Sequence, residues 1–306
     1  MVVPVYNEAQ VLGLLWERLR PVLAPDDELV FVNDGSEDKT AESILQLIDS
    51  DKRIRLINFS RNFGHQPAVS AGLKFARGDA VVVMDADLQD PPEMIPSMVE
   101  RWEEGYDVVH CVRRKRKESR LKRLSYGLFY RMYSWSSEFP THVQAGDFAL
   151  MSRRVVDEIN RMEECGKFVR GLRSYVGFEQ TKIEYDRDAR IAGKPKYGYP
   201  KLIKLALDGL FSFSTLPLRA MMTGGLLLLF VSFIAICLLT YWRLFHKMEI
   251  GHTMTYVLVL FFGGLNTFCL GVIGEYLGRV FYEVKKRPSY IVESVVGYEV
   301  GGDKDI

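Results

Sequence analysis

The segment Ala80–Asp90 reads AVVVMDADLQD, and it decides the fold class because a short apolar run ends abruptly in acidic and amide side chains. Short apolar, β-branched runs are typical of buried strands. Two earlier segments have the same form: Val2–Val5 is followed by Tyr6–Glu8, and Glu28–Asn33 by Asp34–Ser36. In open α/β sheets, ligands bind at the carboxyl ends of the strands. We therefore expect these polar residues to line one crevice.

Strand-like and helix-like segments alternate through the first part of the chain. The strand candidates are Val2–Val5, Glu28–Asn33, Ile54–Phe59, Ala80–Met84 and Asp107–Val112. The helical candidates are Ala9–Val22, Thr40–Asp49, Pro67–Phe75 and Glu93–Glu104. This alternation predicts an α/β domain with a mostly parallel sheet.

Composition limits the classes of protein. A chain of 306 residues can hold one sizeable domain and a small appendage. The formal charge of +1 argues against a nucleic-acid binder, which would carry a strongly basic domain. The four widely spaced cysteines predict no disulfide and a reducing, cytosolic-facing domain; they are Cys111, Cys165, Cys237 and Cys269. Residues 1–5 lack the features of a secretory signal.

Two long apolar runs follow the α/β pattern. Neither 220–242 nor 253–274 contains Asp, Glu, Lys or Arg, and each is long enough to cross about 30 Å of hydrocarbon. We predict two transmembrane helices; the alternative is a pair of buried core helices. Lysines and arginines flank both outer ends, which places those ends in the cytoplasm. Glycines within the runs allow close helix packing and suggest a homo-oligomer; they are Gly224, Gly225, Gly263 and Gly264.

Between the α/β pattern and the apolar runs lies an amphipathic segment. Lys201–Phe213 has a narrow polar stripe and suits a helix in the bilayer interface, although it could instead pack on the α/β core. The predicted organisation is an α/β domain over residues 1–197, an interfacial helix over 198–216, a transmembrane hairpin over 217–278 and a cytoplasmic tail over 279–306. The tail after Tyr298 is glycine-rich and charged, which predicts disorder.

The acidic residues after the fourth strand candidate indicate a metal site. Carboxylates gathered at one edge repel each other, and a cation or a hydrogen-bonding ligand is the simplest reason to bring them together. Asp87 and Gln89 are the candidate ligands, and Asp85 can point the same way because it lies one side-chain period before Asp87. Carboxylate and amide oxygens suit Mg²⁺ or Mn²⁺.

Taken together and in order, three motifs resemble those of family 2 glycosyltransferases of the GT-A fold: Val2–Glu8, Asn33–Ser36 and Asp85–Glu93. Within that family the chain is most similar to polyprenyl-phosphate hexosyltransferases, of the dolichol-phosphate mannose synthase type and the bacterial GtrB type. The resemblance covers nearly the whole chain, including the two apolar runs. It implies a nucleotide-sugar donor and a lipid-phosphate acceptor.

The resemblance also implies roles for individual residues on the donor side. Pro4, Tyr6 and Glu8 would line the nucleoside pocket, Asp34 would contact the base, Asp85 would help to hold the nucleotide, and Asp87 and Gln89 would hold the metal on the diphosphate. The metal would neutralise charge on the leaving nucleotide. Pro4 and Tyr6 could instead be ordinary turn and packing residues.

On the acceptor side, Gly146–Met151 resembles the family segment that supplies a catalytic aspartate, here Asp147. Ala149 stands where an arginine is common, which removes one expected basic contact. Asp147 after Gly146 could alternatively shape a turn. A phosphate acceptor is largely ionised near neutral pH, since its second pKa is about 6. Asp147 would therefore orient the nucleophile as much as deprotonate it.

The acceptor phosphate requires basic partners, for which arginine forks are well suited. The candidates are Arg113, Arg131, Arg190, Lys196 and Tyr197. The resemblance points to arginines near the first two of these. His65 is expected to be a local hydrogen-bonding residue rather than a metal ligand.

We therefore expect a membrane enzyme that transfers a hexose, with inversion, to a polyprenyl phosphate on the cytoplasmic face. By resemblance, UDP-glucose is the favoured donor, and GDP-mannose and modified UDP-pentoses are alternatives. A processive polysaccharide synthase would need further spans and a Gln-x-x-Arg-Trp motif. A non-catalytic membrane scaffold would need damaged acidic motifs. A dinucleotide oxidoreductase would carry Gly-x-Gly-x-x-Gly after the first strand, where Pro4–Glu8 stands instead.

Overall fold

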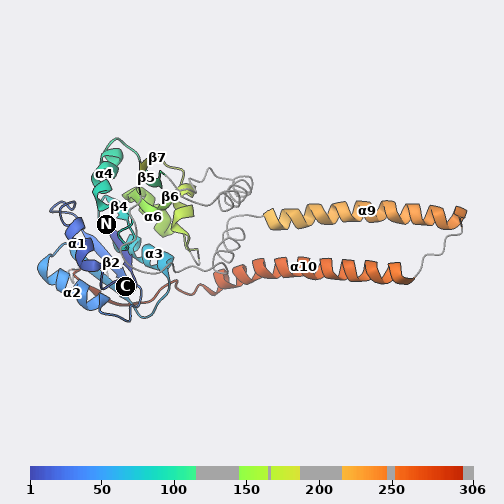
Figure 1. Ribbon diagram of the computed structural model, residues 1–306, viewed down its shortest axis with the longest axis horizontal. Coiled ribbons are helices and arrows are strands. Elements are labelled where there is room, and N and C mark those ends of the chain that lie inside the picture. Colours follow the sequence, from blue (N-terminus) through green and yellow to red (C-terminus); the bar gives the residue numbers. More distant parts are fainter. Residues whose placement is uncertain (115–144, 165–166, 187–215, 247–251, 299–306) are drawn as a thin grey trace. The chain divides into compact units, whose positions relative to one another are not determined.

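A computed structural model describes residues 1–114, 145–164, 167–186, 216–246 and 252–298 (Figure 1). The chain forms two compact units. Of the described residues, the first unit holds 1–114, 145–164, 167–186 and 287–298, and the second holds 216–246 and 252–286. Four predicted acceptor-side residues lie outside the described residues: Arg131, Arg190, Lys196 and Tyr197. Cys165, residues 198–215 of the predicted interfacial helix and the chain after Tyr298 also lie outside them.

The first unit is built on one eight-stranded sheet with the order β7-β5-β6-β4-β1-β2-β3-β8. The strands are β1 Val2–Val5, β2 Leu29–Asn33, β3 Ile54–Phe59, β4 Ala80–Val83, β5 Val108–Arg113, β6 Ala145–Ser152, β7 Gln180–Tyr185 and β8 Val292–Val296. Strands β1 to β4 form a parallel centre, and β5 pairs in parallel with β7. Strand β6 is antiparallel to β4 and β5, and β8 is antiparallel to β3. The prediction of a mostly parallel α/β sheet is confirmed.

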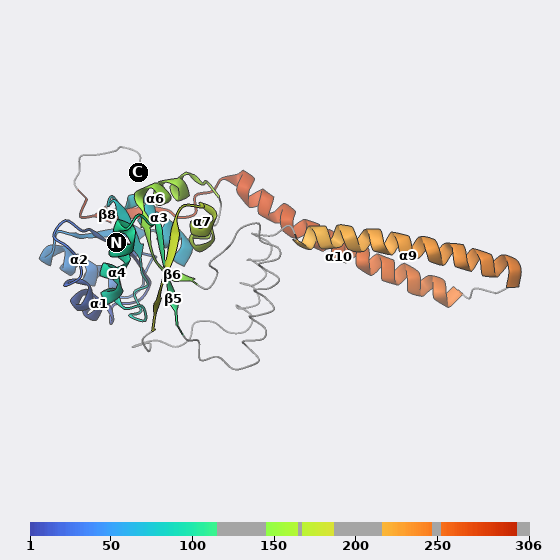
Figure 2. The same cartoon turned by 90° about the horizontal axis from the view of Figure 1, so that it is seen from above.

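Helices cover both faces of this sheet. They are α1 Leu12–Leu19, α2 Thr40–Ser50, α3 His65–Phe75, the short 3₁₀ helix η1 Pro92–Met94, α4 Ile95–Glu103, α6 Arg153–Arg161 and α7 Val169–Tyr175. One apolar core contains residues of α1, α2 and α4, and the other contains residues of α3, α6 and α7. Figure 2 shows α3, α6 and α7 gathered together, away from α1, α2 and α4.

Burial on both faces explains the composition of the central strands. Val3 and Val5 of β1 belong to one core while Val2 belongs to the other, because successive strand side chains point to opposite faces. All residues of β1 and β2 are buried. A strand that is covered on both faces reads as a continuous apolar run rather than an alternating one.

Three strands were not among the predicted segments. Strand β6 begins with polar or small residues, and β7 reads QTKIEY with most side chains only partly buried, as expected at a sheet edge. Strand β8 falls in the region predicted to be a cytoplasmic tail. It extends the sheet by pairing with β3, and the Tyr290 ring just before it stacks on the Phe59 ring with centroids 5.1 Å apart.

The second unit consists of two long helices, α9 Leu216–His246 and α10 His252–Lys285, which contact each other. Both were predicted as helices, and both extend beyond the apolar runs. Many of their large apolar side chains are exposed. No helix in the described part of the chain combines the length and the apolar character needed to cross a membrane. Crossing of a bilayer by residues 217–278 stays a prediction.

Candidate functional site

The candidate site lies where strand order reverses along the chain, between β1 and β4. From β1 the chain proceeds to β2 and β3 on one side, whereas β4 lies on the other side. Such a switch point is where ligands bind in open α/β sheets. Pro4, one of the predicted nucleoside-pocket residues, lies in β1 and has no N–H to donate to a neighbouring strand. The β1–β4 register is limited to Val2 with Val83, so the two strands separate beyond this point.

Sharp turns follow all four parallel strands at this edge. Each of these turns contains a residue with left-handed backbone: Asn7 (φ 56°), Gly35 (φ 65°), Gly64 (φ 105°) and Leu88 (φ 56°). Non-glycine residues rarely adopt this conformation, and they concentrate at functional sites when they do. At Gly35 a Cβ atom would lie 2.4 Å from the backbone carbon of Arg61, so the loops after β2 and β3 pack backbone against backbone.

The loop after β1 carries two of the predicted nucleoside-pocket residues, Tyr6 and Glu8, both partly exposed. Its backbone is held by side chains that precede or begin α2. The Asn7 N–H donates to Ser36 Oγ (3.0 Å), and the Glu8 N–H donates to Thr40 Oγ1 (2.9 Å). The loop is therefore fixed against the loop after β2, and both the nucleoside-pocket and the packing interpretation of Tyr6 stay predictions.

Asp34 is buried and anchors the loop that begins α3. Its carboxylate accepts the N–H groups of Phe63 (2.7 Å) and Gly64 (2.9 Å). Burial raises the pKa of Asp34, and these two hydrogen bonds oppose the rise. This structural role was not predicted. The predicted contact with a base stays a prediction.

A pocket of about 480 Å³ opens beside these loops, at the carboxyl ends of β2 and β3. Its walls include Gly35 and Ser36 after β2, Arg61 and Asn62 after β3, and Glu293 of β8. The last of these was not foreseen, because β8 was not predicted. The pocket places polar side chains next to the loop that Asp34 anchors.

The segment after β4 presents its polar residues on one side. Asp85, Asp87 and Gln89 are partly exposed. They alternate with Ala86, Leu88 and Asp90, which are buried. The prediction that Asp85 and Asp87 share a direction agrees with this alternation. Asp87 Oδ1 accepts the Gln89 N–H (3.2 Å), which tightens the turn around Leu88.

A second acidic residue approaches this segment from β6. Ligand atoms of His65, Asp85 and Asp147 all lie within 4.8 Å of one another, and the group could hold a metal ion. Carboxylate oxygens suit Mg²⁺ or Mn²⁺, and imidazole suits transition metals. The donor set therefore fits the predicted kind of cation. The roles of Asp87 and Gln89 as ligands stay predictions, to which the structure adds His65 and Asp147 as candidates.

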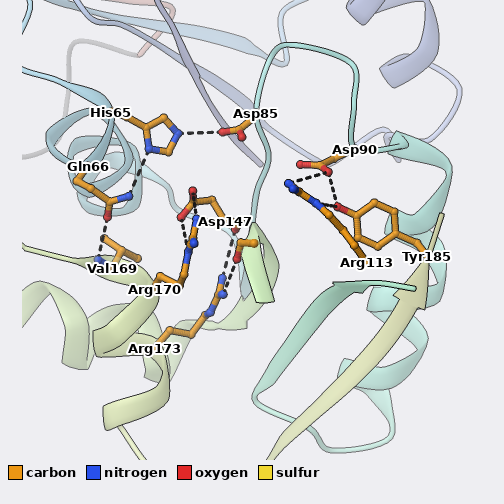
Figure 3. A network of polar contacts seen from close by, with 11 residues as sticks. His65, Gln66, Asp85, Asp90, Arg113, Asp147, Val169, Arg170, Arg173 and Tyr185 are labelled. Carbon is orange, nitrogen blue, oxygen red and sulfur yellow. Dashed lines mark hydrogen bonds and ion pairs between the residues drawn. The ribbon is translucent and has the colours of Figure 1, made fainter. Parts of the chain in front are cut away.

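His65 makes the local hydrogen bonds that were predicted for it. Its Nε2 lies 2.9 Å from Asp85 Oδ1, and its Nδ1 lies 3.3 Å from Gln66 Nε2 (Figure 3). Burial acts to lower the pKa of His65, but the bond and the charge of Asp85 outweigh it and raise the pKa. Gln66 Oε1 also accepts the Val169 N–H (3.0 Å), which ties the start of α7 to α3.

Asp147 lies within strand β6, so the alternative that it shapes a turn is wrong. Arg170 forms a two-pronged ion pair with it, with Nη2 to Oδ2 at 2.6 Å and Nε to Oδ1 at 3.3 Å. Burial acts to raise the pKa of Asp147, but the Arg170 guanidinium outweighs burial and the pKa is lowered. Asp147 is therefore an ionised carboxylate at neutral pH.

Arg173 supports the same strand through hydrogen bonds to its backbone. Its side chain is among the largest that are fully buried, and it donates to the carbonyls of Gly146 (2.9 Å) and Asp147 (3.2 Å). Burial lowers its pKa to about 10, so it stays protonated at neutral pH. Figure 3 shows Arg170 and Arg173 reaching Asp147 from the same helix.

Arg113, at the end of β5, is the predicted acceptor-side arginine that the structure describes. Its Nε donates to the Tyr185 hydroxyl (3.4 Å), its Nη2 lies 3.9 Å from Asp90 Oδ1, and the Tyr185 hydroxyl donates to Asp90. Arg113 Nη2 is also 3.7 Å from the position that a Cβ on Gly146 would take. Arg113 thus lies beside the residue that precedes Asp147, and its contact with the acceptor phosphate stays a prediction.

Three features of this site were missed in the sequence: Arg170, Arg173 and the convergence of His65 with Asp147. The arginines are three residues apart on α7, a spacing that places two side chains on one helical face. That spacing was the available signal. It does not reveal which strand the face covers.

Comparison with known proteins agrees with this geometry. The family model described as "Glycosyl transferase family 2" matches residues 1–160. The protein of Bacillus subtilis (strain 168) called "Uncharacterized glycosyltransferase YkcC" is 46% identical over 98% of this chain and 94% of its own length. The "Bactoprenol glucosyl transferase" of Shigella phage SfII is 41% identical over 96% of each chain.

Among solved structures, glucosyl-3-phosphoglycerate synthase from Mycobacterium tuberculosis is 18% identical with a TM-score of 0.48, over 69% of this chain and 76% of that chain. A likeness this distant carries no argument about substrate. The family match and the two relatives are sufficient for classification. The chain belongs to glycosyl transferase family 2, and it is a glycosyltransferase.

Proposed function

We propose that this glycosyltransferase moves a hexose from a nucleotide diphosphate to a polyprenyl phosphate, with a divalent metal and with inversion at the anomeric carbon. The observation that carries the proposal is the convergence of Asp147 and Asp85 at one sheet edge, within 4.8 Å. One carboxylate belongs to the segment that resembles the donor site, and the other to the segment that resembles the acceptor site. The relative named bactoprenol glucosyl transferase supports a lipid acceptor.

Glucose from UDP-glucose is the favoured donor, because that relative's name specifies glucosyl transfer. GDP-mannose and a modified UDP-pentose are the alternatives. Family membership favours an enzyme over the non-catalytic scaffold. The proposed product is polyprenyl-phosphate β-glucose.

The charge of Asp147 suits a phosphate nucleophile. With its pKa lowered by Arg170, Asp147 is a weak base, and a phosphate that is already largely ionised needs little deprotonation. We infer that Asp147 and its arginine orient the attacking oxygen. Mg²⁺ or Mn²⁺ would stabilise negative charge on the leaving diphosphate. Asp87 and Gln89 would hold the ion, with Asp85, His65 or Asp147 nearby. Pro4, Tyr6, Glu8 and Asp34 would surround the nucleoside.

Membrane association forms part of the proposal. The apolar runs at 220–242 and 253–274 and the exposed apolar side chains of α9 and α10 favour contact with lipid. The basic residues that flank these runs favour a cytoplasmic location for the α/β unit and the C-terminus. A homo-oligomer formed through the glycine-containing helices is part of the same proposal.

The test is a transfer assay with the full chain in detergent. It contains undecaprenyl phosphate, Mn²⁺ or Mg²⁺ and one of three labelled donors: UDP-glucose, GDP-mannose or a UDP-pentose. We expect labelled lipid from one donor in a β linkage. Asp147→Asn should reduce turnover by about a hundredfold, because the attacking oxygen is no longer oriented. Asp157→Asn is the matched control on the exposed side of α6, with half of its side chain in solvent, and should be as active as wild type.

Each outcome separates the alternatives. An α-linked lipid product would contradict inversion. Metal-dependent binding of a nucleotide sugar without lipid product from any donor would contradict the lipid acceptor. Polymeric product would favour a processive synthase. Full activity of Asp147→Asn would remove Asp147 from the reaction.

A further inference from the structure

In the part of the chain that the structure describes, three arginines lie around the Gly146–Asp147 segment, and their surroundings differ. Arg173 is fully buried, and its two hydrogen bonds described above are to backbone carbonyls. Arg113 is held by Asp90 and Tyr185. Arg170 contacts the carboxylate of Asp147 while a third of its side chain, 33%, stays exposed. Of these three arginines, Arg170 is the one that contacts the Asp147 carboxylate and also has a partly exposed side chain.

We propose that Arg170 is a binding residue for the acceptor phosphate, and that its guanidinium bridges this phosphate and Asp147 during transfer. The inference rests on the function proposed above and assigns to it a residue that neither the motifs nor the resemblance indicated. Arginine suits the role because its planar fork can contact two anions at once.

Charge balance at Asp147 favours such a bridge. A phosphate that approaches an ionised carboxylate is repelled unless a cation lies between the two groups. Arg170 already lies against Asp147, with Nη2 and Nε as the donors. Arg173 cannot serve in its place, because its side chain is only 1% exposed. Among the described arginines beside Asp147, Arg170 is therefore the one that we assign to the phosphate.

A chain of hydrogen bonds positions the helix that carries Arg170 relative to the rest of the site. The residue before it, Val169, donates its N–H to Gln66 Oε1, and Gln66 Nε2 contacts His65, which contacts Asp85. The backbone at the start of α7 is thus linked to the segment after β4. Asp147, which Arg170 contacts, belongs to β6 rather than to that donor-side segment. For this reason we assign the bound phosphate to the acceptor rather than to the donor diphosphate.

The experiment compares wild type, Arg170→Gln and Arg170→Lys as full chains in detergent. The control is Arg161→Gln, on α6, where the arginine side chain is 74% exposed and pairs with Glu158. Initial rates are measured over a range of undecaprenyl phosphate and over a range of the donor that wild type uses. Binding of the corresponding nucleoside diphosphate with Mn²⁺ is measured by calorimetry.

We expect Arg170→Gln to raise the KM for undecaprenyl phosphate by about tenfold or more, because hydrogen bonds to a charged group are lost. We expect the KM for the donor and the affinity for the nucleoside diphosphate to change by less than about twofold. Arg170→Lys keeps the charge without the fork and should give an intermediate KM for the acceptor. Arg161→Gln should match wild type.

Other results overturn the inference in distinct ways. A lower kcat with an unchanged acceptor KM would mean that Arg170 only positions Asp147. A weaker nucleoside diphosphate affinity with an unchanged acceptor KM would mean that the bound phosphate belongs to the donor. If Arg170→Gln unfolds, Arg170→Lys decides, and an unchanged acceptor KM in that variant refutes the proposal. A wild type without lipid product would overturn the proposed function as well.

Discussion

Leu88 offers a direct test of the turn that carries Asp87 and Gln89. Its side chain is fully buried, and its backbone has φ 56°. Replacing a buried leucine with alanine costs about 2–5 kcal/mol. Alanine would keep the penalty of left-handed backbone, about 1–2 kcal/mol, whereas glycine would remove it. Glycine also loses one more buried methyl group, worth about 0.8 kcal/mol. Leu88→Gly should therefore equal or exceed Leu88→Ala in stability.

The matched control is Leu73, which is equally buried but lies in α3. In a helix, glycine is about 0.8–1 kcal/mol less favourable than alanine, and the lost methyl adds to this difference. The difference in free energy of unfolding between the glycine and the alanine variant should therefore change by roughly 2 kcal/mol from position 73 to position 88. For a domain of this size that corresponds to about 4–8 °C in melting temperature.

The assay is apparent Tm for the four variants in one detergent at a single scan rate. All four should melt below wild type. The diagnostic quantity is the order of glycine and alanine at each position. If Leu88→Gly melts below Leu88→Ala by as much as the corresponding Leu73 pair differs, the left-handed turn does not contribute as argued.

Two further stability predictions concern the α/β unit away from the site. Burial acts to raise the pKa of Asp107, but the bond to Arg154 lowers this pKa below the ordinary 3.8. The stabilisation that ionised Asp107 gives to the fold is therefore complete above pH 3.8 and is lost as pH falls through the lower pKa of the folded state. Urea midpoints of wild type and Asp107→Asn should differ most near neutral pH and converge below about pH 4, and a constant difference would contradict this. Gly72→Ala should destabilise by about 1–3 kcal/mol in urea unfolding because the new Cβ would lie 2.1 Å from Val2 Cγ1. Gly13→Ala, with nothing within 4 Å, should instead stabilise by about 0.5–1 kcal/mol, and equal effects would refute the packing argument.

The central strands were predictable because each is an apolar run with a polar end, a local pattern. The same pattern predicted that Asp85 and Asp87 share a direction, and the structure adds that both are partly exposed while Ala86 between them is buried. These features need no knowledge of distant residues. They explain why the polar segments after β1, β2 and β4 could be located from the sequence.

The surroundings of Asp147 could not be predicted in this way, because their geometry depends on non-local pairing. Strand β6 pairs with β4 and β5, and only that pairing brings Asp147 next to His65 and Asp85. Arg173 has the sequence character of a surface residue. Its burial is possible because carbonyls of β6 accept its N–H groups, a compensation that the local sequence does not show.

The return of the chain to the sheet after α10 changes what a catalytic fragment must contain. The two long helices are an insertion between β7 and β8 of a single sheet, rather than an addition to a finished domain. A fragment cut before α9 would lose β8 and leave β3 as an open edge, which is a template for aggregation. It would also lose the Tyr290 ring from Phe59 and the Ser294 hydroxyl from Asn58. Excising the helices while joining residues on either side of them would keep every strand of the sheet.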